Sequence, residues 1–428
     1  MSMTIVLFLS LAFLVVSGVP VAFSIGLSSM VTMMICIPDL SLTLVAQRCF
    51  AGINSFPLMC VPFFIIAGEF MSRGNISTKL INFADVFVGR ITGGLAHVNV
   101  LTSMLFGGVS GSAQADVAST GPVMIPTMVK AGYSRDFSTA ITATSATIGM
   151  IIPPSNAMII YSTVASSVSV SAMFIAGIIP GILVGLAQMV VAYVIAKKRH
   201  YPKSAKLNGR QKLTYIVQGF PPLMTFVIIM GGILGGIFTP TESAVIATFY
   251  NFFLAVFGYK TVSLKEVPNM LYRSALTTGV ALFLISTSSI FGWILAYGNI
   301  PQQIAKALLA LTSNQFLIYL LIFVLLLLVG TVMDMAPALI IFVPIFLPIV
   351  QQLGMSSIQF GLMIIMSLCI GLFTPPVGTV LFLACNIGHE SIEKVSRSMI
   401  PFMFSMIFIV LLVIFIPAIT TYLPSVLG

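Results

Sequence analysis

Long apolar runs follow one another along the chain and are separated by short polar stretches. The runs 3–37, 214–234 and 399–422 contain no charged residue. Because about 20 apolar residues in a helix cross the hydrocarbon core of a bilayer, this pattern predicts an all-α polytopic membrane protein. The run from Met3 is longer than a signal peptide and lacks a cleavage site, so we expect a retained helix that crosses once over 3–37.

The composition agrees with this prediction. Of 428 residues, 58% are hydrophobic and 7% are charged, too few charges to cover a soluble domain of this size. The sequence contains no GxxxxGK[ST] phosphate-binding loop, which argues against an ATP-driven pump. Five cysteines, an odd number without CxxC spacing, are expected to be buried apolar side chains and not a metal or redox site.

Glycines and prolines recur along the chain at a constant separation. The segment IGMIIPP at 148–154 matches IGLFTPP at 370–376, a separation of 222. The same separation joins further pairs: Gly108 and Gly330, Pro122 and Pro344, Pro126 and Pro348, and Gly132 and Gly354. Slightly upstream, Gly74 pairs with Gly298 at 224. So many positions in register indicate an internal repeat.

The charges of the connecting loops predict that the two copies are inverted. The stretches 73–79 and 130–136 are basic, whereas their counterparts 297–303 and 351–359 are uncharged. After the Pro-Pro segments the order reverses, because 163–171 is neutral, whereas 389–397 is charged and contains Lys394 and Arg397. Lysine and arginine accumulate in cytoplasmic loops, so this alternation indicates inverted topology.

These anchors predict three parts of the chain in a membrane. The first repeat covers 1–200, with a hairpin at about 93–129 and a broken helix at about 137–161. Residues 201–234 form a basic cytoplasmic loop and a linking transmembrane helix. The second repeat covers 235–428, with a hairpin at about 316–350 and a broken helix at about 358–386. This path places the N-terminus in the cytoplasm and the C-terminus in the periplasm.

Two kinds of segment interrupt the apolar helices. The first is rich in small and polar residues and lies midway in each predicted hairpin, at 106–116 and 329–337. Two full crossings joined at the far surface would also fit, but short arms and a lightly polar tip favour a re-entrant hairpin. The second is the Gly-x-x-x-Pro-Pro segment, at 149–154 and 371–376. Because two adjacent prolines remove two donors, freed backbone groups are tolerable only within protein or beside a wet cavity.

These interruptions carry the candidate chemistry. Free carbonyls and hydroxyls suit a hard cation such as Na⁺, and the N-termini of half-helices suit an anionic substrate. A simple proline kink is the plainer alternative, but two copies at the same spacing after two hairpin tips argue against it. Among the intramembrane carboxylates, Asp334 lies in the second tip and aligns with Ser112 in the first. Asp116 follows the first tip and could serve either a cation site or a structural role.

The remaining acidic residues and the histidines have simpler interpretations. Glu69 lies one turn before Arg73 and is expected to pair with it, while Glu242 follows Thr239-Pro240-Thr241 like a helix-capping acid. The histidines at 97, 200 and 389 are too scattered for a metal site.

A cation-coupled secondary transporter is the function that this pattern favours. An intramembrane serine protease is an alternative, since Gly108-Val109-Ser110-Gly111 resembles the motif of rhomboid-type proteases, but no histidine is placed to serve that serine. A channel is a third possibility, although paired hairpins in an inverted repeat favour alternating access.

Several motifs together resemble the large membrane subunit of TRAP transporters (tripartite ATP-independent periplasmic transporters) over nearly the whole chain. They include GVPVA at 18–22, PFFIIAGE at 62–69, the tip at 108–116, IIPPS at 151–155, AGIIPG at 176–181, TPTE at 239–242 and FTPPVG at 373–378. The resemblance implies a location in the bacterial inner membrane, an elevator mechanism and import of an organic acid driven by Na⁺. It also implies a separate small membrane subunit of four helices and a soluble periplasmic substrate-binding protein. The N-terminal sequence is most similar to the sialic-acid branch of the family, and import of a C4-dicarboxylate is the alternative.

The resemblance also implies where ligands bind. It places one cation site at Gly108, Ser110, Ser112, Gly149, Ile152 and Pro153. It places the other at Gly330, Thr331, Met333, Asp334, Gly371 and Thr374. Substrate is expected between them, near Ser155, Asn156, Gly378 and Thr379.

Overall fold

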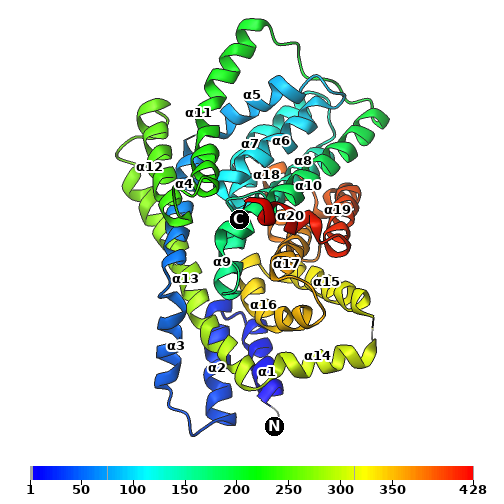
Figure 1. The fold of residues 1–428 in the computed structure, drawn as a ribbon. Helices are drawn as coiled ribbons and strands as arrows, with labels where there is room; N and C mark the ends of the chain where they lie inside the picture. The colour runs from blue at the N-terminus through cyan, green and yellow to red at the C-terminus, as the bar shows by residue number, and fades with distance from the viewer. Residues whose placement is uncertain (1–2, 75, 313, 428) are drawn as a thin grey trace.

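The computed structural model describes residues 3–74, 76–312 and 314–427, and these residues form helices and no strand (Figure 1). Within this part of the chain, seven helices are long and apolar enough to cross a membrane. The all-α polytopic prediction is therefore confirmed. Most of the helices assemble around one extended apolar core.

The first apolar run differs from its prediction as a single crossing. It forms two helices, α1 (Met3–Val16) and α2 (Val21–Cys36), which pack side by side. The chain reverses between them, where Gly18 has φ +81° and Val19 N–H donates to Leu14 O at 3.1 Å. Glycine adopts this left-handed conformation without a steric penalty, and Pro20 cannot continue the helix. The predicted crossing over 3–37 is therefore wrong.

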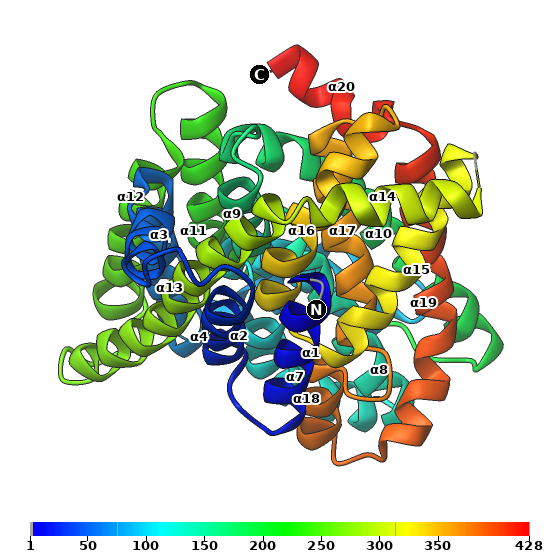
Figure 2. The ribbon, with the colours of Figure 1, turned by 90° about the horizontal axis from the view of Figure 1, so that it is seen from below.

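A second group of helices packs beside α1 and α2. It contains α3 (Thr43–Ile53), the 3₁₀ turn Phe56–Met59, α4 (Cys60–Arg73), α11 (Gly209–Leu234), α12 (Pro240–Phe253, continued by a π turn at Leu254–Gly258) and α13 (Val267–Tyr297). Helix α13 packs against α2, α3 and α4, and α12 packs against α4 and α11. Seen from below, these helices occupy one side of the molecule (Figure 2). We call them, with α1 and α2, the frame.

The other side holds the two hairpins and the two broken helices. The first hairpin is α6 (Gly94–Ser110) with α7 (Ala113–Lys130), and the second is α15 (Gln315–Val332) with α16 (Met335–Gln352). The first broken helix is α8 (Arg135–Ala146), a 3₁₀ turn (Thr147–Met150) and α9 (Asn156–Val164). The second is α17 (Ser357–Leu372) with α18 (Thr379–Gly388). Together with the helices that follow them, α10 (Val170–Lys198) and α19 (Ile392–Phe415), they are here called the core group.

Two short helices connect the frame to the hairpins. They are α5 (Ile76–Val88) before the first hairpin and α14 (Ile300–Leu311) before the second. Figure 1 shows α5 near the top of the molecule and α14 near the bottom, so the two arms lie at opposite ends. That placement agrees with an inverted arrangement of the two halves.

The element boundaries repeat at the separations seen in the sequence. Helices α7, α8 and α10 begin 222 residues before α16, α17 and α19, and α3 and α5 begin 224 residues before α13 and α14. The copies differ at two places. The pair α3 and α4 is interrupted where α13 runs unbroken, and α10 is unbroken where the second copy divides into α19 and α20 (Ala418–Leu427) at Pro417. The apolar run 399–422 is therefore divided between two helices.

The reversal after α1 changes what the loop charges imply for the N-terminus. Thr4 Oγ1 donates to Gln303 Oε1 at 3.4 Å, so the start of the chain lies at the uncharged segment 297–303. That segment was predicted to lie outside, and the N-terminus was predicted to lie inside. The two predictions exclude each other. Near the other end of the chain, Gln359, the last residue of the uncharged 351–359 stretch, donates to Val413 O at 2.9 Å, so the end of α19 lies beside that stretch.

Candidate functional site

The first hairpin tip lies against the first helix break. A methyl group added to Gly107 would lie 2.1 Å from Gly149 Cα, and one added to Gly111 would lie 3.0 Å from Asn156 N. Gly111 also has φ +59° and ends α6, so the chain turns there without a side chain. The tip therefore stops beside the break and does not reach the far end of α9. This placement supports the re-entrant interpretation over two full crossings.

The second tip meets the second break in the same manner. A methyl group added to Gly371 would lie 2.3 Å from the carbonyl carbon of Gly330. The Thr331 carbonyl oxygen accepts hydrogen bonds from Val377 N at 3.2 Å and Gly378 N at 3.1 Å. Gly330, Thr331 and Gly371, three of the expected cation-site residues, are thus brought together with Gly378, which was expected near the substrate. Sequence reasoning missed Gly107, although the Gly107-Gly108 pair carried a signal.

Each break is more than a kink. Residues 151–155 and 373–378 are not helical, and each contains a cis peptide bond between its two prolines. In this described part of the chain, six carbonyl oxygens of the breaks accept no hydrogen bond: those of Ile152, Pro153, Pro154, Thr374, Pro375 and Pro376. The first three belong to buried residues, and because buried carbonyls normally have partners, these oxygens are available to a ligand. In the second break Thr374 is half-buried and Pro375 and Pro376 are exposed, so their carbonyls are open to solvent as well as to a ligand.

Two predicted ligands are buried polar groups without a partner. Ser110 is 4% exposed and its hydroxyl makes no hydrogen bond. Asn156 is half-buried, but its side-chain oxygen is enclosed and also makes no hydrogen bond. An unpaired buried polar group costs about 1–3 kcal/mol, so a bound ligand would relieve that cost. Other predicted hydroxyls already donate to backbone: Thr331 to Leu328 O at 2.7 Å and Thr374 to Ile370 O at 2.6 Å. A donating hydroxyl keeps its lone pairs free, so these groups fit a cation as well.

A single amide connects the two tips. Gln114 Nε2, in the first turn of α7, donates to Asp334 Oδ1 at 3.1 Å and lies 3.3 Å from Thr379 Oγ1. Ser112 Oγ lies 3.3 Å from Gln114 Oε1 on the other side. We call this contact the Gln114 bridge. It brings Ser112, Asp334 and Thr379 together from segments about half the chain apart, and sequence reasoning did not single out Gln114.

The N-termini of four helices surround the bridge. Ser112 caps α7, Ser155 caps α9, Asp334 precedes α16 and Gly378 precedes α18. Helix α7 packs along α18, and α9 packs along α16, so each hairpin faces the half-helix of the other copy. Unpaired N–H groups and the helix dipole make such ends favourable for anions. Ser155 Oγ donates to Met150 O at 2.6 Å and is fully buried.

The other predicted residues fall outside this cluster. Asp116 is fully buried in α7 and faces the hydroxyls of Ser103 and Thr120, not the bridge. Glu69 forms an ion pair with Arg73, and Glu242 forms a capping box with Thr239, as predicted. Within the described residues, no group of three potential metal-binding side chains is present. Three of the five cysteines are buried and two are half-buried.

Comparison with known proteins identifies the family. The pattern of the family described as "Tripartite ATP-independent periplasmic transporter, DctM component" matches residues 8–419. The chain belongs to this family. As a large TRAP permease it is a multi-pass membrane transporter subunit that works with a small membrane subunit and a periplasmic binding protein.

Relatives with different printed substrates are about equally similar. The chain is 37% identical to the sialic acid TRAP large permease SiaM of Vibrio cholerae, covering 96% of each chain. It is 37% identical to the C4-dicarboxylate TRAP large permease DctM of Pseudomonas aeruginosa, covering 95% of this chain and 94% of that one. It is 39% identical to the isethionate TRAP permease DctMQ of Oleidesulfovibrio alaskensis, covering 97% of this chain and 66% of that one. All three are named as permeases, so the chain is not an enzyme and the protease alternative is set aside.

A solved structure shares the fold. The YdaH transporter of Alcanivorax borkumensis superposes with a TM-score of 0.62 over 87% of this chain and 88% of that one, at 16% identity. At this identity the likeness concerns the arrangement of helices alone.

Proposed function

We propose that this TRAP large permease imports an organic acid by Na⁺-coupled symport, with substrate bound at the Gln114 bridge. The bridge carries the proposal, because one side chain from the first hairpin contacts both a tip carboxylate and a half-helix of the second copy. A ligand that replaces these contacts would join the two halves of the core group.

Sodium coupling is supported by the chemistry of the two tip-to-break contacts. Carbonyls without partners, hydroxyls with free lone pairs and the single carboxylate of Asp334 are hard oxygen ligands. The two clusters differ, since the first supplies Ser112 where the second supplies Asp334. We therefore propose two Na⁺ sites of different character.

Recognition of a carboxylate would rest on helix N-termini and polar side chains. Gln114, Asn156 and Thr379 offer neutral donors, and none of the hydrogen bonds of the bridge involves lysine or arginine. A bulky sugar acid such as sialic acid is the substrate that we favour, and a C4-dicarboxylate is the alternative. The equal likeness to relatives of both kinds leaves the choice to experiment.

An elevator movement is supported by the division into frame and core group. The frame helix α13 contacts the core group through α16 and the frame helix α4 contacts it through α6 and α7, whereas the core-group helices contact one another along their lengths. Two bodies joined by the arms α5 and α14 can slide relative to each other and carry the bridge across the membrane.

Uptake into proteoliposomes tests the proposal. The vesicles contain both membrane subunits, and the binding protein is added outside. Sialic acid, succinate and isethionate are each offered with and without an inward Na⁺ gradient. We expect one acid to accumulate only with the gradient. Equal accumulation without Na⁺ would contradict the coupling, and accumulation of succinate alone would move the substrate to the C4-dicarboxylate class.

A further inference from the structure

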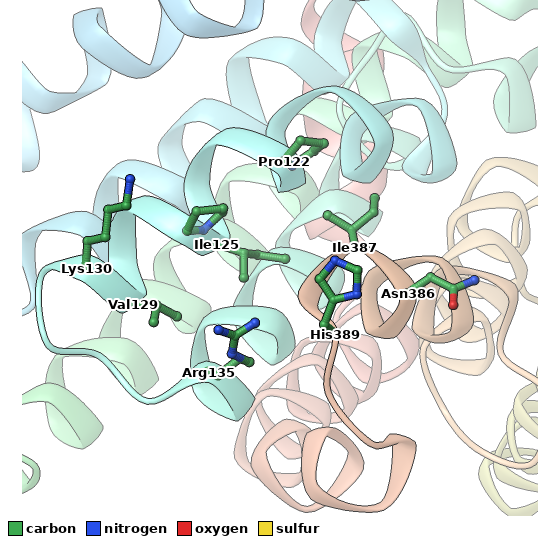
Figure 3. A pocket seen from close by; sticks show the side chains of 9 residues that line it. Pro122, Ile125, Val129, Lys130, Arg135, Asn386, Ile387 and His389 are labelled. Carbon is green, nitrogen blue, oxygen red and sulfur yellow. The ribbon is translucent and has the colours of Figure 1, made fainter.

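A pocket opens at the far end of the helices that carry the bridge. It lies between α7, the start of α8 and the end of α18, and its volume is about 590 Å³ (Figure 3). Its walls are Pro122, Ile125, Pro126, Val129, Lys130, Arg135, Asn386, Ile387 and His389. This size lies within the range of about 300–1,000 Å³ that small-molecule sites occupy.

The pocket is connected to the bridge by two parallel helices. Gln114 near the start of α7 contacts Thr379 at the start of α18, and Gly121 contacts Ile387 further along both helices. Pro122, the first residue of the pocket wall, follows Gln114 by eight positions, which is about 12 Å along a helix. A small anion leaving the bridge along α7 and α18 therefore meets this pocket next.

The polar wall of the pocket is basic. The side chains of Arg135 and His389 point toward the space between α7 and α18. Lys130 lies at the outer edge of the pocket, and its amine points away from the pocket (Figure 3). Arg135 Nη1 donates to Gly388 O at 3.0 Å, which fixes the guanidinium beside the end of α18. No acidic side chain lines the pocket. A guanidinium held in this manner can form paired hydrogen bonds with a carboxylate.

The acidic residues nearest in sequence are already paired elsewhere. Asp136 accepts a hydrogen bond from Ser398 and lies 3.7 Å from Arg199. Although burial raises the pKa of Asp136, the bonds from Ser398 and Ser134 and the charge of Arg199 hold that pKa below its usual value. Glu390 pairs with Lys394 at 3.3 Å. Neither carboxylate neutralises the pocket.

The equivalent positions in the second copy are neutral. At the separation of 222, Lys130, Arg135 and His389 align with Gln352, Ser357 and Ser167. The corresponding cavity beside Pro344 and Thr163 is smaller, about 290 Å³, and frame residues such as Gly52 and Ser288 cover it. The tendency of loops to be basic on the cytoplasmic side explains the sign of the charge. It does not explain why two of these charges line a cavity at the end of the α7–α18 pair.

We propose that this basic pocket binds the carboxylate of an organic anion between the Gln114 bridge and the cytoplasm. This inference rests on the proposed function, since the anion is the transported acid. Binding here needs no Na⁺, because the cation ligands lie at the tips and breaks. The pocket gives a released acid a second site, so that release from the bridge does not require direct transfer to water.

Equilibrium binding of radiolabelled sialic acid, and separately of succinate, tests the pocket. The sample is the purified complex of both membrane subunits in lipid nanodiscs without Na⁺. The variants are Gln114→Ala, which removes the bridge, and Arg135→Gln combined with His389→Asn, since asparagine tolerates the φ of +48° at position 389. Lys203→Gln with Lys206→Gln, in the exposed basic loop, is the matched control that also removes two cation-capable residues. Arg135→Lys tests whether the planar fork matters, and its melting temperature together with that of the double variant shows that both fold.

The proposal predicts that Na⁺-independent binding survives Gln114→Ala. It also predicts that the Arg135 and His389 double variant weakens this binding at least ten-fold, that Arg135→Lys has an intermediate effect, and that the loop control changes it less than two-fold. If the double variant shows unchanged Na⁺-independent binding, the proposal that the pocket binds the acid is wrong, and the proposed function is unaffected. Conversely, Na⁺-dependent binding with unchanged affinity in Gln114→Ala refutes the proposed transport site and leaves the proposed pocket site intact.

Nanodiscs of neutral lipid are compared with nanodiscs that contain phosphatidylglycerol. In one outcome, the anionic lipid displaces the acid from the native complex, and the double variant no longer retains that lipid. This outcome would overturn the proposal that the pocket is a substrate site and would assign the pocket to a lipid headgroup.

Discussion

Replacing Gly371 with alanine should weaken Na⁺ coupling at the second hairpin tip. The new methyl group would lie 2.3 Å from Gly330 C, 2.4 Å from Gly330 Cα and 2.7 Å from Thr331 N, all backbone atoms. Carbon atoms in contact lie about 3.5–4.0 Å apart, so the tip must withdraw by about 1 Å. The two bonds accepted by Thr331 O, now 3.1 and 3.2 Å, would then exceed hydrogen-bond length. At about 1 kcal/mol each, their loss costs about 2 kcal/mol, or roughly 30-fold in an equilibrium constant.

The assay is the initial rate of uptake into proteoliposomes at increasing external Na⁺ and saturating substrate and binding protein. We expect Gly371→Ala to raise the Na⁺ concentration for half-maximal uptake by about ten-fold or more, within the bound set by that equilibrium constant. Gly279→Ala is the matched control, because a methyl group there has no atom within 4 Å. If Gly371→Ala folds, reaches the membrane and shows the Na⁺ dependence of the control, the second tip is not part of a cation site.

Four further predictions follow from individual contacts. Asp334→Ala should raise the Na⁺ requirement more than it raises the substrate KM, because its carboxylate is the one charged cation ligand at the tips; a normal Na⁺ dependence would remove Asp334 from the cation site. Gln114→Ala should raise the substrate KM about ten-fold, the cost of about one hydrogen bond to a charged group, and a KM equal to that of Gly279→Ala would contradict the bridge. Asn156→Ala with Thr379→Ala should raise KM or lower the rate of uptake, and unchanged values of both would end their assignment as substrate ligands. Thr239→Ala removes a capping box and should lower the stability of the complex by about 1 kcal/mol, read as a lower melting temperature with Na⁺ dependence unchanged.

The glycines and prolines were the residues from which the candidate site was predicted in the sequence. Each Pro-Pro segment breaks its helix, and each small-residue tip allows a hairpin to reach that break. The closeness of Gly371 to Gly330 was implied only by the resemblance, although backbone meets backbone at this place in both copies. That all four segments meet near one place was likewise implied only by the resemblance.

The Gln114 bridge could not be predicted because its partners are distant in the sequence. An amide at 114, a carboxylate at 334 and a hydroxyl at 379 share no local pattern, and nothing along the chain indicates that α7 packs on α18. The alignment of the copies even paired Asp334 with Ser112, whereas the structure links both through Gln114. A contact between copies is not visible in a comparison of one copy with the other.

The reversal at Gly18 was missed for a different reason. In a membrane, both faces of a helix can be apolar, so hydropathy does not distinguish one long helix from two short ones packed together. The signals were local, Gly18 followed by Pro20, and they were weaker than the uninterrupted apolar run around them. A reporter at each chain end would show on which side of the membrane each end lies.

Na⁺-dependent binding of the transported acid to the purified complex of both membrane subunits tests the central claim most directly. The claim is that the two hairpin tips, the two breaks and the Gln114 bridge form one Na⁺-coupled site. The account predicts that acid binding tightens as Na⁺ rises, and that Gln114→Ala weakens this Na⁺-dependent binding about ten-fold while Gly279→Ala leaves it unchanged. Binding that does not respond to Na⁺ in the native complex, or Na⁺-dependent binding with the same affinity in Gln114→Ala as in the native complex, would contradict it.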